Sequence, residues 1–127
     1  MADFRVSLAP SPSAPREARR ALADMRAHVD EDLAERSDLV VSELVTNSLR
    51  HAGLSESERI ELQVSVRPAL VRIEVTDSGN GFEPVAIRPG RENDAGGWGL
   101  WMIDQMTDRW GVDFSHSTHV WCEFDRA

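Results

Sequence analysis

Alternating apolar and polar residues mark five segments of this chain as strands. The clearest pair is Ile60–Val66 and Leu70–Val75, two period-two runs joined by Arg67-Pro68-Ala69, which predicts an antiparallel hairpin. The same alternation predicts three further strands, at residues 4–8, about 110–114 and 118–124. All five are expected to lie in one sheet.

Helical spacing of apolar residues predicts three helices between these strands. After a proline-rich break, the predicted helices cover Arg16 to about Val29, about Leu33 or Ser37 to His51, and residues 98–108. Gly53 is expected to end the second helix. Residues 82–98, which are rich in proline and glycine, predict a mobile loop.

The order of these elements predicts an α+β fold. Strands that pair mainly with their neighbours, and helices that enter in blocks, favour a two-layer α/β sandwich. We expect a mixed, mostly antiparallel sheet with helices on one face, forming a single domain over residues 1–127.

Charge and composition exclude several classes of partner. The formal net charge of -8 opposes nucleic acid as a partner, because phosphate backbones are bound by clustered cations. No apolar run is long enough for a membrane span, and the first residues lack the features of a signal peptide, so a soluble, cytoplasmic protein is expected. The single cysteine, Cys122, is expected to be a buried small hydrophobe.

The basic residues exclude two further chemistries. All fourteen are arginines. A P-loop needs a lysine that reaches the terminal phosphates, and Schiff-base chemistry needs a lysine amine. A nucleotide that binds here must therefore use another architecture.

Three polar or glycine-rich motifs are candidates for chemistry, although each one alone has an ordinary explanation. Glu43 and Asn47 share one helix face, where an amide oxygen suits Mg²⁺ and a carboxylate suits a general base. Asp77-x-Gly79-x-Gly81 follows a strand, as a turn would, but it could also hold the amino group of adenine. Gly96-Gly97-Trp98-Gly99-Leu100 is either a loop before a helix or a phosphate site at that helix N-terminus.

In this order and spacing the three motifs resemble the N, G1 and G2 boxes of the Bergerat-fold (GHKL) ATP-binding superfamily, which includes gyrase, heat-shock protein 90, histidine kinases and MutL. The runs 41–52, 77–82 and 97–104 are similar to the small stand-alone anti-sigma-factor serine/threonine-protein kinases. The tail, 109–112 and 118–124, is similar to that subgroup too.

The resemblance implies a role for each matching residue. Glu43 would be the catalytic base and Asn47 the Mg²⁺ ligand. The nucleotide-binding residues would be Asn47, Asp77, Gly79, Gly81, Gly97, Gly99, Leu100 and Thr118, with Asp77 and Gly81 at the adenine and Thr118 helping to hold adenine and Asp77. Residues 83–96 would be the ATP lid, and the cofactors would be ATP and Mg²⁺.

The resemblance also implies a function and partners. It implies a regulator that binds a sigma factor and transfers the γ-phosphate of ATP to a serine of a STAS-type antagonist, and it makes a homodimer reasonable. Two residues depart from the family pattern: Trp98 is bulky, and Ser117 stands where glycine is usual. These departures favour the alternative, a non-catalytic ATP-sensing binding module, whereas Glu43 and Asn47 favour the enzyme. A sensor histidine kinase is disfavoured, because His28 lacks a following acidic residue and the chain has no room for a dimerisation domain.

Overall fold

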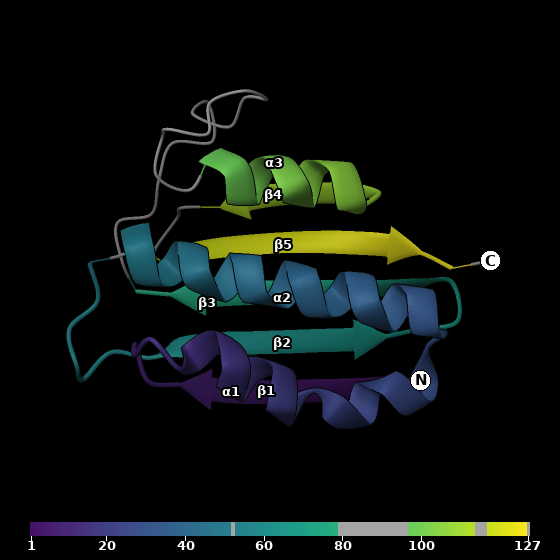
Figure 1. The fold of residues 1–127 in the computed structure, drawn as a ribbon, viewed down its shortest axis with the longest axis horizontal. Coiled ribbons are helices and arrows are strands. Elements are labelled where there is room, and N and C mark those ends of the chain that lie inside the picture. Colours follow the sequence, from purple (N-terminus) through teal and green to yellow (C-terminus); the bar gives the residue numbers. More distant parts are fainter. Residues whose placement is uncertain (52, 79–96, 114–116, 127) are drawn as a thin grey trace.

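The computed structural model describes residues 1–51, 53–78, 97–113 and 117–126, with backbone alone for residues 51 and 97–100. Within these residues the elements follow one another as β1 (Ala2–Leu8), α1 (Ala14–Ala21), the 3-10 helix η1 (Ala23–His28), α2 (Glu31–His51), β2 (Ile60–Val66), β3 (Leu70–Asp77), α3 (Gly97–Met106), β4 (Arg109–Asp113) and β5 (Thr118–Asp125). Figure 1 shows how they are arranged.

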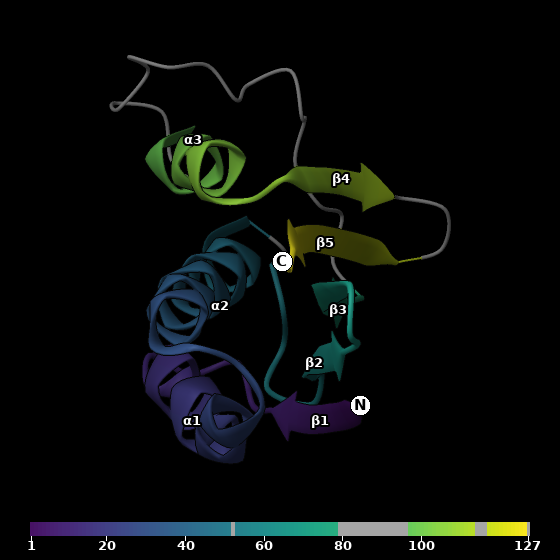
Figure 2. The ribbon, with the colours of Figure 1, turned by 90° about the vertical axis from the view of Figure 1, so that its right-hand side faces the viewer.

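The five strands form one sheet, and the helices form one layer against it. The strand order is β1-β2-β3-β5-β4, and every described pair of neighbours is antiparallel. Figure 2 shows α1, α2 and α3 on the same side of the sheet, so the opposite face, called the outer face below, carries none of the described helices. The predicted α+β sandwich is confirmed.

The alternation in the sequence explains which side of each strand is buried. Alternate residues of β2, β3 and β5 face the helices and are buried, because successive side chains of a strand point to opposite faces. The core combines residues of these strands with residues of α2, chiefly Val40, Val41, Leu44, Val45, Ile60, Leu62, Val64, Ile73, Val75 and Phe124. As expected, Cys122 is buried, and burial raises the pKa of its thiol to about 12.

The prediction of one continuous helix over residues 16–29 is wrong. The α-helix ends at Ala21, and the chain continues as η1 from Ala23. In a 3-10 helix residues three apart lie on one side, so the tighter turn buries both Leu22 and Met25. Helical spacing alone does not distinguish this turn from a regular α-helix.

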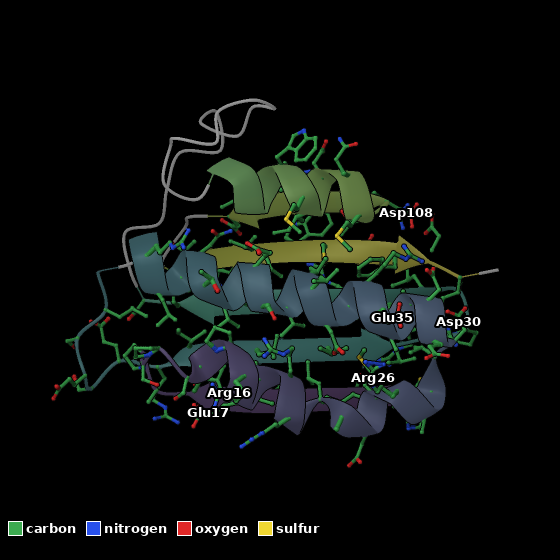
Figure 3. All side chains as sticks on the ribbon, viewed as in Figure 1. Arg16, Glu17, Arg26, Asp30, Glu35 and Asp108 are labelled. Atoms are coloured by element: carbon green, nitrogen blue, oxygen red, sulfur yellow. The ribbon has the colours of Figure 1, made fainter. Side chains whose placement is uncertain are left out.

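The second helix begins earlier than predicted because Asp30 caps it. The backbone N–H of Leu33 donates to the Asp30 carboxylate at 2.8 Å, which satisfies one of the free donors of the first turn. Figure 3 shows Asp30 beside the N-terminal end of α2. At the other end α2 stops at His51, and Gly53 follows with a φ of 62°, as its predicted role requires.

Candidate functional site

The last turns of α2 carry the first two predicted site residues. Glu43 is half-buried, whereas Asn47 is 1% exposed. Four residues separate them, so their side chains lie on the same side of the helix, one turn apart. The structure gives the Glu43 carboxylate no hydrogen bond or ion pair with another described residue. The role of Glu43 as a general base stays a prediction.

The buried amide of Asn47 has an unmet hydrogen-bonding group. Its Nδ2 atom has no hydrogen-bond partner among the described residues. A buried donor without a partner costs about 1–3 kcal/mol, so native proteins rarely keep one without a use for it. A flip of the side-chain amide exchanges its nitrogen and oxygen atoms in nearly the same space. The position can therefore offer either a donor to a phosphate or an acceptor to a metal ion, which fits the predicted Mg²⁺ ligand.

Asp77 and Thr118 lie directly opposite each other on neighbouring strands. Asp77 is the last residue of β3 and Thr118 the first of β5, and the register of the two strands pairs them. Asp77 is 4% exposed and Thr118 is 2% exposed. Both side chains belong to the buried, helix-facing series of their strands. β3 is longer than the predicted run 70–75, and this extension brings Asp77 into the sheet.

These residues come together at one end of the sandwich, which we call the site end. In Figure 1 the C-terminal turns of α2, the end of β3 and the start of β5 lie on the same side of the molecule. The start of α3 lies there too. Arg36, near the beginning of α2, donates to the backbone carbonyl of Met106, the last residue of α3, at 3.3 Å. The end of α3 therefore lies beside the beginning of α2, and in Figure 1 the two helices run in opposite directions. Both helices rise about 1.5 Å per residue, so Gly97, the first residue of α3, lies level with the last turns of α2.

Several predicted site residues lie outside the described part of the chain. They are Gly79, Gly81 and the whole predicted lid, 83–96. Gly97, Gly99 and Leu100 are described only as the first backbone turn of α3. That turn carries the N–H groups that have no acceptor within the helix, and a phosphate site at a helix N-terminus depends on such groups. The structure therefore places Glu43, Asn47, Asp77, Thr118 and the start of α3 at the same end of the sandwich.

Sequence reasoning missed a contact that holds the chain next to Asp77. The hydroxyl of Ser78 donates to the carboxylate of Glu58, which also accepts the backbone N–H of Ser55 at 2.9 Å. These bonds lower the pKa of Glu58, and the Ser78 hydroxyl makes the larger contribution. The loop between α2 and β2 is thereby tied to the residue that follows Asp77. No local pattern predicts this contact, because the loop and the strand are separate in the sequence.

Comparison with known families identifies the chain. The family model of the histidine kinase-like ATPase domain matches residues 8–121. This match covers most of the chain, including all the site residues described above. The chain belongs to the histidine kinase-like ATPase domain family. The description of the family implies ATP as the nucleotide.

Solved structures of histidine kinases share this ATPase-domain fold. One is the histidine kinase domain of a blue-light activated histidine kinase from Erythrobacter litoralis, with a TM-score of 0.54 and 25% identity, over 72% of this chain and 43% of that one. Another is the mycobacterial sensor histidine kinase MprB, with a TM-score of 0.57 and 16% identity, over 72% of this chain and 71% of that one. The first match thus spans less than half of its relative. No curated protein matches this ATPase domain.

None of the helices in the described part of this ATPase domain combines the length and the apolar character needed to cross a bilayer.

Proposed function

We propose that this ATPase domain is an anti-sigma-type regulator that transfers the γ-phosphoryl group of Mg·ATP to a serine of a STAS-type antagonist of its own activity. The observation that carries the proposal is the burial of Asn47, Asp77 and Thr118 at the site end, with Glu43 one turn from Asn47. Burying the amide nitrogen of Asn47 without a partner among the described residues is costly, and the phosphates of ATP offer acceptors that match it. The resemblance of the three motifs to stand-alone serine kinases supports this choice of substrate.

Each residue has a distinct task in the proposed site. Asp77 accepts the amino hydrogen of adenine, and Thr118 on the opposite strand helps to hold the base. Asn47 is the residue that would hold Mg²⁺, which when bound neutralises part of the phosphate charge. The backbone N–H groups at the start of α3 meet the phosphates. Binding therefore uses both layers of the sandwich.

The transfer step assigns the proton to Glu43. The serine oxygen of the antagonist forms a bond to the γ-phosphorus, the bond from that phosphorus to the β,γ-bridging oxygen breaks, and ADP leaves. The serine proton passes to the Glu43 carboxylate, which has no hydrogen bond or ion pair with another described residue. The new phosphate adds negative charge to the antagonist and weakens its interface with the regulator, which then holds the sigma factor.

A transfer assay with γ-labelled Mg·ATP and a panel of purified STAS-type proteins tests the proposal. We expect label on a serine of one panel member. The Glu43→Gln variant should still bind ATP but should transfer the label about 10²–10⁴ times more slowly, because it cannot take the proton. Acid-labile label on a histidine would instead assign the activity of a histidine kinase, and the serine assignment would then be wrong.

A second candidate is a non-catalytic ATP-sensing module that changes its affinity for a protein partner. Ser117, which precedes Thr118, favours it: this residue stands where the related kinases usually carry glycine, and its hydroxyl is held by His119 at 2.9 Å. Such a module would bind ATP and transfer nothing. ATP-dependent capture of a sigma factor, with unlabelled antagonists throughout the panel, would select this candidate over the kinase.

A further inference from the structure

The outer face of the sheet carries a hydrogen-bonded cluster directly behind the site end. It consists of Glu74, Thr76, Ser117 and His119, and is called the His119 cluster below. All four side chains are half-buried. They come from the end of β3, the start of β5 and the residue before β5. None of them faces the helices, so none belongs to the proposed nucleotide site itself.

His119 uses both ring nitrogens in this cluster. Its Nδ1 atom lies 3.0 Å from Glu74 Oε1 and 3.0 Å from Thr76 Oγ1, and its Nε2 atom lies 2.9 Å from Ser117 Oγ. A carboxylate can only accept, so Nδ1 carries the hydrogen in this arrangement. In the neutral imidazole Nε2 then accepts from the Ser117 hydroxyl. One side chain thus joins β3 to β5 and also holds the residue before β5.

The register places this junction one residue from the proposed adenine site. Thr76 pairs with His119, and the next pair along the same two strands is Asp77 with Thr118. Side chains alternate, so the first pair faces outward and the second faces the helices. The ends of a strand pair open more easily than its middle. A side-chain bridge at the last outward pair limits this opening and keeps the Asp77 carboxylate opposite the Thr118 hydroxyl.

We infer that His119 is a positioning residue for ATP: through Thr76, Glu74 and Ser117 it fixes the spacing of Asp77 and Thr118, without touching the nucleotide. The inference rests on the proposed function, in that it takes Asp77 and Thr118 as the adenine-binding pair. It adds a determinant of affinity on the face of the sheet opposite the ligand. Substitutions in the His119 cluster are therefore expected to alter ATP binding, whereas substitutions at other positions of the outer face are not.

The test compares His119→Ala with a matched control on the same strand and face. Glu123 also bridges β5 to β3, by an ion pair with Arg72 at 3.1 Å, near the opposite end of β5. Arg72 also lies 3.5 Å from Glu74, and the Glu123→Ala variant keeps this second ion pair. By isothermal titration calorimetry we expect His119→Ala to weaken ATP binding about three- to tenfold, the equivalent of one lost hydrogen bond. Glu123→Ala should leave the affinity unchanged. Equal effects of the two variants, or none from His119→Ala, would overturn the inference.

A conservative variant separates positioning from general stability. In His119→Asn the amide nitrogen takes the place of Nδ1 and keeps the donor for Glu74, so we expect most of the ATP affinity to return. The free energy of unfolding, measured in urea, should fall by similar amounts in His119→Ala and Glu123→Ala. A loss of affinity in His119→Asn as large as in His119→Ala would contradict the role assigned to Nδ1.

Hydrogen exchange tests the same inference without nucleotide. In the ligand-free protein, backbone amides around Asp77 and Thr118 should exchange faster in His119→Ala than in the parent, and at the parent rate in Glu123→Ala. If the parent bound no ATP, the proposed function would fail, and exchange would still decide whether His119 holds this strand end. Unchanged exchange in His119→Ala would refute the positioning role.

Discussion

The two ends of the β3–β5 strand pair share one register but bury opposite kinds of side chain. At the site end Asp77 lies opposite Thr118, whereas near the other end Val71 lies opposite Phe124. All four are buried against the helix layer. The apolar pair shows what this sandwich uses when only packing is needed. At the equivalent depth of the site end the same strand pair buries a carboxylate and a hydroxyl instead, so the two ends differ in the chemistry that they present to the helix layer.

The helix layer shows the same difference between the apolar end and the site end. Near the start of α2, Arg36 lies over the ring of Phe124, 5.2 Å from its centroid, and binds the last carbonyl of α3. Near its end, Asn47 is buried with an unpartnered amide nitrogen. α3 is therefore anchored at its C-terminal end, and its N-terminal end lies at the proposed phosphate site. Stability and binding should respond separately to substitutions at the two ends.

The largest effect is expected from Phe124→Ala at the apolar end. Removing a fully buried ring from a core should lower the free energy of unfolding by about 3–5 kcal/mol. Urea unfolding followed by circular dichroism measures the change. As a control, Phe124→Leu should cost no more than about 1.5 kcal/mol and should leave ATP affinity unchanged. A weaker affinity for ATP in Phe124→Leu would mean that the two ends are not independent.

At the site end, Asp77→Asn should weaken ATP binding and leave the stability of the fold nearly unchanged. The substitution keeps the shape of the side chain but removes its charge and one acceptor, so ATP binding should weaken about 10- to 100-fold, as for a lost charge-assisted hydrogen bond. The free energy of unfolding should change by less than about 1 kcal/mol. Titration calorimetry measures the affinity. Asp125→Asn makes the same chemical change at the far end of β5 and should leave binding intact; unchanged affinity in Asp77→Asn would refute the adenine assignment.

The sequence predicted the elements better than the contacts between them. Period-two runs predicted the strands. The roles that the three motifs predict for Asn47, Asp77 and Gly97 stay predictions, although the elements that carry these residues share one end of the sandwich. The 3-10 turn at Leu22 was missed because its burial depends on tertiary packing, and the Asp30 cap was missed although an Asp before a helix is a local signal. The bond between Thr76 and His119 joins residues 43 positions apart. Only the register of β3 against β5 determines such a contact.

Ser37 is an exception at the apolar end, and it gives a third test. Its hydroxyl is fully buried in α2 and has no partner among the described residues. Ser37→Ala should raise the free energy of unfolding by about 1 kcal/mol, because it removes an unpaired polar group and improves helix propensity. ATP affinity should not change. Ser42→Ala is the control on the same helix: its hydroxyl donates to the Asp38 carbonyl and accepts from Arg19. Losing both bonds should outweigh the same gain in helix propensity, so a loss of about 0.5–1 kcal/mol is expected. A destabilised Ser37→Ala would show that this hydroxyl has an essential partner.

The smallest expected effect is on the stability of the fold at acidic pH, and it should arise from ion pairs away from the site end. Arg109 binds Glu123 at 2.8 Å and Asp125 at 2.5 Å, and the guanidinium lowers the pKa of both carboxyl groups. The folded protein therefore binds fewer protons than the unfolded chain at mildly acidic pH. The stabilisation by these ion pairs is complete above the ordinary pKa range of carboxyl groups, and it is lost as the pH falls through the lowered pKa values. Arg109→Gln removes the larger of the two arginine contributions at Glu123, the other being Arg72, and the main cause at Asp125. Its melting temperature should fall less steeply with acid than that of the parent, with ATP affinity at neutral pH unchanged; parallel curves would show that these pairs contribute nothing to acid sensitivity.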